Sequence, residues 1–254
     1  MTRFIFSDVS PKSRNEPTKR QWLVAALVCS GFYLLLSAVS CRQQQAASET
    51  PAPTFFSVLL TALLPSILAL AVARSVFRAP MASLIRIVAW PDNSKSPLRT
   101  FFSFFLVGLL LGPVFAQFSG WMESLLCHLF HLEAEMQSAV SAVLAPTENP
   151  WIRRILVLSI FTLIPLGEEL SFRSLIFAGF RNALEERIPC ARAIAAIAGS
   201  LVFAAAHMDV LRFVPLFVFA LCLCFAFQRK GLPASFGMHA GFNAANLVQL
   251  FLFL

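Results

Sequence analysis

The sequence predicts an all-α fold, a polytopic bundle of transmembrane helices, and three observations lead to this class. Hydrophobic residues make up 58% of the 254 residues, whereas charged residues make up 13%. The mean hydropathy is +0.74, which is typical of membrane proteins. The apolar residues also gather in long runs without the alternation of a barrel strand, so helices are the form that satisfies every backbone group in lipid.

Seven apolar segments follow one another along the chain, and most are long enough for a helix to cross about 30 Å of hydrocarbon. They are residues 22–39, 55–76, 101–118, 155–180, 193–208, 213–227 and 233–254, of which the fifth and sixth are short. Residues 1–21 are basic and contain Ser and Pro, which predicts a disordered cytoplasmic head. We therefore divide the chain into this head, N-terminal membrane helices over 22–150 and a membrane core over 151–254, the last two forming one membrane domain.

The basic residues predict the orientation of the bundle. If the N-terminus is cytoplasmic, 16 of the 20 Lys and Arg residues fall on that side, as the positive-inside rule requires. The exceptions are Arg42, Arg153, Arg154 and Arg212. Seven spans then leave the C-terminus outside, and we expect the protein in the inner or plasma membrane of a bacterium. Insertion explains the net charge of +7, so no nucleic-acid partner is expected.

Residues 121–144 differ from the spans. Leucine, methionine and valine recur there at helical spacing, with glutamates between them. This pattern predicts an amphipathic helix on the outer surface. Within it, His128, His131 and Glu135 would share one helix face and could hold a metal ion, although an ordinary polar stripe is the alternative interpretation.

A charge cluster lies inside the fourth apolar segment. Ionisable groups at bilayer depth are costly and usually face a protein interior, where they mark a function. Glu169 and Arg173 are four residues apart, so we expect them to pair on one helix face. Glu168 points elsewhere and must find its neighbours on other helices, and a desolvated carboxylate of this kind suits a general base. Pro165, just upstream, is expected to kink the helix.

Two later segments carry polar groups with the same four-residue spacing. Phe203 and His207 share one face, and the alanines between them allow close helix approach, so His207 is expected to reach Glu168 and help hold a water. His239 and Asn243 share another face, and their N–H groups suit a developing oxyanion. Each group alone has an ordinary interpretation, as an ion site, an interhelical hydrogen bond or helix packing. Together they predict hydrolysis of an amide.

The three motifs, taken in order, resemble those of a known family. Glu168-Glu169-x-x-x-Arg173, Phe203-x-x-x-His207 and His239-x-x-x-Asn243 are similar to the motifs of the CPBP intramembrane proteases. This family includes the type II CAAX prenyl endopeptidases and the bacterial Abi, or bacteriocin-processing, proteins. The resemblance covers about residues 150 to 250, and it implies an all-helical membrane protease.

The resemblance also implies a role for each motif residue. The catalytic residues would be Glu168, His207, His239 and Asn243, and the supporting residues Glu169, Arg173 and Phe203. Glu168 and His207 would activate the water, and the later pair would stabilise the oxyanion. We expect no cofactor, but zinc is the alternative, because one Glu and two His side chains are also a plausible zinc set. In that case Glu168, His207 and His239 would be the metal ligands.

The expected function is therefore an intramembrane endopeptidase that acts on a membrane-associated or lipid-modified protein or peptide. Its partners would be this substrate and the lipid bilayer. Two other classes stay open, namely a non-enzymatic membrane protein, such as a bacteriocin immunity factor or scaffold, and a proton-coupled carrier that uses Glu168. Replacing Glu168 with Gln separates them, because it removes the base and keeps the shape.

Overall fold

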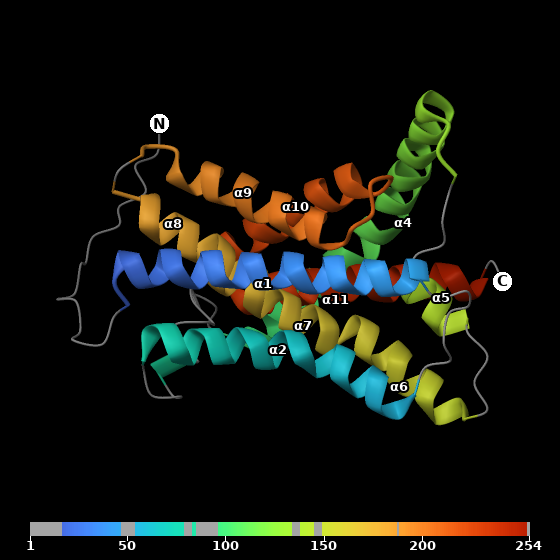
Figure 1. The fold of residues 1–254 in the computed structure, drawn as a ribbon, viewed down its shortest axis with the longest axis horizontal. Helices are drawn as coiled ribbons and strands as arrows, with labels where there is room; N and C mark the ends of the chain where they lie inside the picture. Colours follow the sequence, from blue (N-terminus) through green and yellow to red (C-terminus); the bar gives the residue numbers. More distant parts are fainter. Residues whose placement is uncertain are drawn as a thin grey trace.

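The computed structural model describes residues 17–46, 54–78, 83–84, 96–133, 138–144, 149–186 and 188–252, and this part of the chain is helical, without strands. The longer helices run in alternating directions along one bundle (Figure 1). The helices are α1 (Lys19–Ala46), α2 (Phe55–Phe77), α4 (Pro97–Phe130), α5 (Ser138–Leu144), α6 (Pro150–Phe161), α7 (Leu163–Glu169), the π-helix η1 (Leu170–Phe177), α8 (Ala178–Leu184), α9 (Ala191–Ala206), α10 (Phe213–Lys230) and α11 (Leu232–Leu252).

Five helical stretches among the described residues are long and apolar enough to cross a membrane: Lys19–Arg42 of α1, α2, α4, the continuous run from α6 to α8, and α10. The predicted all-α polytopic bundle is thus confirmed, although five of the seven predicted spans meet this standard. The apolar helix α9 is shorter, with 16 residues. The last predicted span, α11, is outside the set because His239, Asn243 and other polar residues lower its hydropathy.

Several helix ends follow directly from the local sequence. The side chain of Thr54 caps α2, and Ser57 completes a reciprocal capping box. Ser96 and Asn149 cap α4 and α6, each with a proline at the first turn, where its missing N–H is not needed. Gly231, with a φ of 72°, allows the sharp turn from α10 into α11.

The closest helix pair is α4 with α11. A Cβ atom added at Gly108 would lie 2.1 Å from the Met238 carbonyl oxygen, and one added at Gly241 would lie 2.1 Å from the Phe105 carbonyl oxygen. Gly112 and Gly237 also leave no room for a Cβ atom against the facing helix, with nearest atoms at 2.4 Å and 2.3 Å. Small residues on both helices therefore let the backbones touch, as in other membrane bundles. This contact fixes α11, the helix that carries His239 and Asn243, against α4.

A methyl group at this contact is expected to weaken the bundle. Because the added Cβ of Gly108→Ala would overlap backbone atoms, we expect a loss of about 1–3 kcal/mol in the free energy of unfolding. Gly120→Ala is the matched control in the same helix, since nothing lies within 4 Å of its added Cβ. Thermal unfolding of the two variants in detergent measures the difference, and equal midpoints would contradict the close packing.

The predicted outer amphipathic helix over residues 121–144 is wrong. α4 continues from the membrane part to Phe130 as a single helix of 34 residues. It ends because His131 adopts a left-handed conformation, with a φ of 54°. The C-terminal part of α4 projects away from the bundle (Figure 1), and a separate short helix, α5, follows.

This helix end also removes the basis of the second metal hypothesis. His131 lies beyond the last residue of α4 and so does not continue the face of His128. Glu135 falls outside the described residues. Within the described ranges there is no group of three His, Cys, Asp or Glu side chains arranged to hold a metal ion.

The N-terminal boundary shifts slightly from the prediction. α1 begins at Lys19, so the last three residues of the predicted head are helical. The predicted head over residues 1–16 lies outside the described residues. The orientation, with a cytoplasmic N-terminus and an outer C-terminus, stays a prediction.

Candidate active site

The helix that carries Glu168 is interrupted on both sides of it. α6 ends at Phe161, and the next residue, Thr162, has a φ of −125° and a ψ of −80°, which are not helical. Pro165 explains this break, because it lacks the N–H that would bond to Phe161 and its ring crowds the preceding turn. Directly after Glu169 the helix widens into the π-helix η1. Such π segments often occur at functional sites, and their wider turn changes the direction of the side chains on either side.

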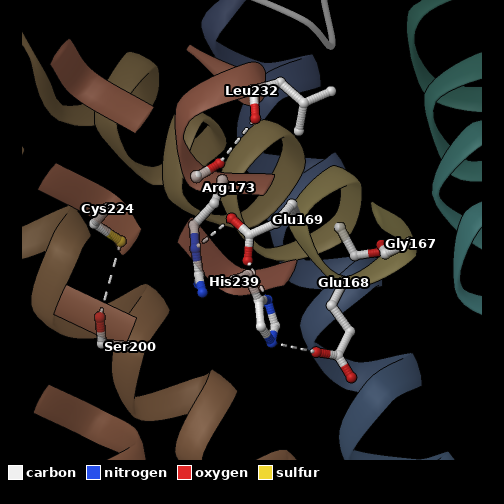
Figure 2. Close-up of polar contacts among 10 residues, drawn as sticks. Gly167, Glu168, Glu169, Arg173, Ser200, Cys224, Leu232 and His239 are labelled. Atoms are coloured by element: carbon white, nitrogen blue, oxygen red, sulfur yellow. Dashed lines mark hydrogen bonds and ion pairs between the residues drawn. The ribbon is translucent and has the colours of Figure 1, made fainter. Parts of the chain in front are cut away.

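Glu169 lies at the centre of a buried polar cluster (Figure 2). Its Oε2 atom is 3.1 Å from Nε of Arg173, and both side chains are fully buried, so the predicted pair forms. Its Oε1 atom is 3.0 Å from Nδ1 of His239 on α11. The four-residue spacing predicted only the pair with Arg173, and no sequence pattern indicated this second contact. One carboxylate therefore joins η1 to α11.

Arg173 has little other polar contact. Its ion pair with Glu169 misses hydrogen-bond geometry, and among the described residues its guanidinium nitrogens have no hydrogen-bond partner. The guanidinium carbon instead lies 4.8 Å from the centre of the Phe203 ring, in a cation–π contact. Removing either Glu169 or Phe203 would therefore leave a buried cation with poor compensation.

Glu168 differs from its neighbour in both exposure and partners. Its side chain is 19% exposed, whereas that of Glu169 is fully buried. The Oε2 atom of Glu168 lies 3.6 Å from Nε2 of His239, too far for a direct hydrogen bond. Figure 2 shows His239 between the two carboxylates. Glu168 thus keeps its hydrogen-bonding capacity on the more open side of the site.

The contacts of the two histidines fix their tautomers. The carboxylate of Glu169, paired with Arg173, accepts a hydrogen bond, so Nδ1 of His239 carries the proton. Nδ1 of His207 is 2.8 Å from the carbonyl oxygen of Phe203, which also only accepts. In a neutral ring, Nε2 of each histidine is then an acceptor. This suits His207 to receive a hydrogen from water, whereas it gives His239 a less direct route to the predicted oxyanion role.

Phe203 connects His207 to the rest of the site. The His207 ring lies 4.6 Å from the Phe203 ring, centre to centre, and the His239 ring lies 6.0 Å from it. No contact between His207 and Glu168 is recorded in the described part of the chain. Their depths in the bundle are nevertheless similar. Glu168 lies sixteen residues before the last residue of α8, and His207 lies sixteen residues after the first residue of α9. The two helices pack as neighbours, so both residues lie at a similar level.

Asn243 makes a contact that the sequence did not predict. Its Nδ2 atom donates a hydrogen bond of 2.8 Å to the carbonyl oxygen of Ile160. This carbonyl lies next to the break at Thr162, where the helical hydrogen-bond pattern stops. Asn243 therefore satisfies a backbone group that the break releases. Its second amide hydrogen stays available to another acceptor, because an amide nitrogen carries two.

A further polar group near Glu168 was missed. The hydroxyl of Tyr33, the single tyrosine of the chain, donates to Oγ of Ser171 over 3.0 Å. Ser171 in turn donates to the carbonyl oxygen of Gly167, also over 3.0 Å. These bonds tie α1 to the turn that carries Glu168. A lone tyrosine within an otherwise apolar span was the available sequence signal.

The donor set fits a zinc site only in part. Glu168 and Nε2 of His239 face each other, and the bond from His239 to Glu169 resembles the carboxylate contact that orients zinc-bound histidines. The third candidate, His207, is held by Phe203 and does not join them in a group of three among the described residues. The three candidate zinc ligands are therefore not gathered in one group among the described residues, and we derive no catalytic step through a metal.

Comparison with known proteins agrees with the motifs. Residues 150–245 match the family of type II CAAX prenyl endopeptidases described as Rce1-like. The match runs from the start of α6 into α11 and contains all seven motif residues. Neither the curated proteins nor the solved structures gave a match. Over this segment the chain is thus similar to the CAAX proteases, in agreement with the resemblance of its ordered motifs to the CPBP intramembrane proteases.

Proposed function

We propose that the protein is an intramembrane endopeptidase in which Glu168 activates the attacking water. The family implies endopeptidase activity of the CAAX type. The observation that supports the role of Glu168 is its contrast with Glu169. Glu169 is fully buried and engaged by Arg173 and His239, whereas Glu168 is partly exposed and lies 3.6 Å from an imidazole nitrogen.

The proposed reaction follows from these positions. Glu168 takes a proton from the water as the water oxygen bonds to the peptide carbonyl carbon. The tetrahedral intermediate then collapses, the carbon–nitrogen bond breaks, and Glu168 gives the proton to the leaving nitrogen. The products are a new carboxyl group and a new amine. His207 would hold the water through its Nε2 atom, and the second amide hydrogen of Asn243 would donate to the oxyanion.

His239 has a different part in this scheme. Because its Nδ1 atom is fixed on Glu169, its Nε2 atom faces Glu168 and the reacting groups. Once Glu168 carries the proton taken from the water, Nε2 of His239 would accept a hydrogen bond from this carboxyl group and orient it until the proton passes to the leaving nitrogen. Glu169 and Arg173 act through His239 by fixing its ring, so we regard them as positioning residues.

The activity can be tested in phospholipid vesicles that contain the purified protein. Two synthetic peptides serve as probes, one with a prenylated cysteine followed by three residues and one of the same sequence without the prenyl group. Mass spectrometry should find a shortened prenylated peptide. Folded protein that leaves the prenylated peptide, and a panel of membrane-spanning peptides, uncut would contradict the proposal.

We further propose that turnover needs no tightly bound metal. The histidine and glutamate contacts are made with protein groups, and water completes the proposed chemistry. Elemental analysis of active protein should therefore find zinc well below one per chain, and a chelator should leave the turnover rate unchanged. Stoichiometric zinc whose removal abolishes turnover and whose return restores it would make Glu168, His207 and His239 metal ligands instead.

A further inference from the structure

The turn that follows His207 is held in an uncommon conformation. His207 is the C-cap of α9, and Met208, the next residue, has a φ of 50°. A residue other than glycine is strained by about 1–2 kcal/mol in this left-handed conformation. The turn then runs through Asp209 to Arg212, and α10 begins at Phe213. Other contacts must therefore hold this backbone in place.

Arg212 supplies those contacts. Its Nη1 atom is 2.7 Å from a carboxylate oxygen of Asp209, and its backbone N–H donates to the other oxygen over 3.0 Å. Its Nη2 atom is 2.9 Å from a carboxylate oxygen of Glu123, which is 89 residues away on α4. The three side chains are only 15–23% exposed. Partly buried charge pairs of this kind are screened less by water and salt than surface pairs.

We call the ion pairs of Arg212 with Asp209 and Glu123 the clamp. Its Glu123 end belongs to a helix that is itself packed firmly in the bundle. Glu123 is on α4, and α4 is locked to α11 through the contacts of Gly108 and Gly241. α11 carries His239. The ion pair between Glu123 and Arg212 therefore connects the turn that carries His207 to the helix pair that carries His239.

We propose that Arg212, together with Glu123 and Asp209, is a positioning element that keeps His207 in register with Glu168 and His239. This inference rests on the proposed function. It assigns a task to residues in the part of α4 outside the family match and to a turn that none of the three motifs includes. Arg212 touches no reacting group, and it acts through the backbone of the turn.

The test compares Arg212→Gln with Arg212→Lys and Glu123→Gln. A displacement of about 1 Å at a catalytic group can lower the rate about 100-fold, so Arg212→Gln should lower kcat by about 10- to 100-fold while KM stays within about twofold. Arg212→Lys keeps the charge and should recover part of this loss. The double variant with Glu123→Gln should be no slower than Arg212→Gln alone, because the two groups act as one unit.

Hydrogen exchange gives a readout that does not depend on catalysis. The backbone amides of residues 207–212 should exchange faster in Arg212→Gln than in the unchanged protein. Arg154→Gln is the matched control, since Arg154 stacks on Trp151 away from the site and should change neither exchange nor kcat. If Arg212→Gln does not fold, Glu123→Gln decides the same question from the α4 side.

These measurements distinguish a failure of the positioning role from a failure of the proposed function. Unchanged exchange in Arg212→Gln, or faster exchange with unchanged kcat, would overturn the positioning role, and so would a change in KM alone. If the unchanged protein cleaves nothing while exchange still rises in Arg212→Gln, the proposed function fails and the positioning role fails with it, although the clamp on the turn is supported.

Discussion

Glu168→Gln should abolish turnover without unfolding the protein. The substitution keeps the size of the side chain but removes the group that takes the proton from water. A positioned general base accelerates a reaction by about 10²- to 10⁴-fold, so we expect kcat to fall by that amount. The side chain is partly exposed and has no ion pair on its own helix, so the thermal midpoint should stay close to that of the unchanged protein. Peptide cleavage in vesicles measures kcat.

Glu185→Gln is the control for this variant. Glu185 lies just after α8 and pairs with the exposed Arg192, and the same chemical change there should leave kcat unchanged. Full turnover by Glu168→Gln would remove Glu168 from the mechanism. If the cleavage itself proved to come from a contaminant, the result would favour a non-enzymatic role for the protein, such as a scaffold.

Glu169→Ala is expected to have the largest effect on stability. Arg173 is fully buried and has the carboxylate of Glu169 as its only ion-pair partner among the described residues. Leaving a buried charge without its partner destabilises a protein by about 3–5 kcal/mol. The variant also releases Nδ1 of His239 from its acceptor, so any folded fraction should turn over slowly. Unfolding in mixed detergent micelles measures the loss of stability.

Glu186→Ala removes a carboxylate from an exposed pair with Lys19 and should change stability by less than about 1 kcal/mol. Glu169→Gln combined with Arg173→Met should recover much of the lost stability, because removing both charges is far less costly than stranding one. It should not recover turnover, since a neutral amide holds the His239 ring less firmly. Full stability of Glu169→Ala, with only catalysis lost, would instead place Glu169 in contact with the reacting groups.

Much of the fold could be predicted because lipid leaves few alternatives for an apolar chain. Long runs without alternation must be helices, and the described residues confirm this. The extent of α4 could not be predicted, because amphipathic spacing after residue 120 looks the same in a separate surface helix and in the end of a long span. The left-handed residue His131, which ends it, has no strong sequence signal.

Some contacts of the site could likewise be predicted from the sequence, and others could not. The spacing of Glu169 and Arg173 predicted their pair, because residues four apart share a helix face. The bond from Glu169 to His239 joins residues 70 positions apart and depends on how α7 meets α11. No local pattern encodes that meeting. The bond from Asn243 to Ile160 likewise depends on the break at Thr162, which lies three residues before the proline that explains it.

The most direct test of the account is cleavage of the prenylated peptide in vesicles made up in water labelled with ¹⁸O. The account predicts that the unchanged protein produces a fragment with one ¹⁸O atom in its new carboxyl group. It also predicts that Glu168→Gln, folded to the same extent, produces no fragment within the same time. No labelled fragment from the unchanged protein, or an equal yield from Glu168→Gln, would contradict an intramembrane peptidase in which Glu168 activates the water.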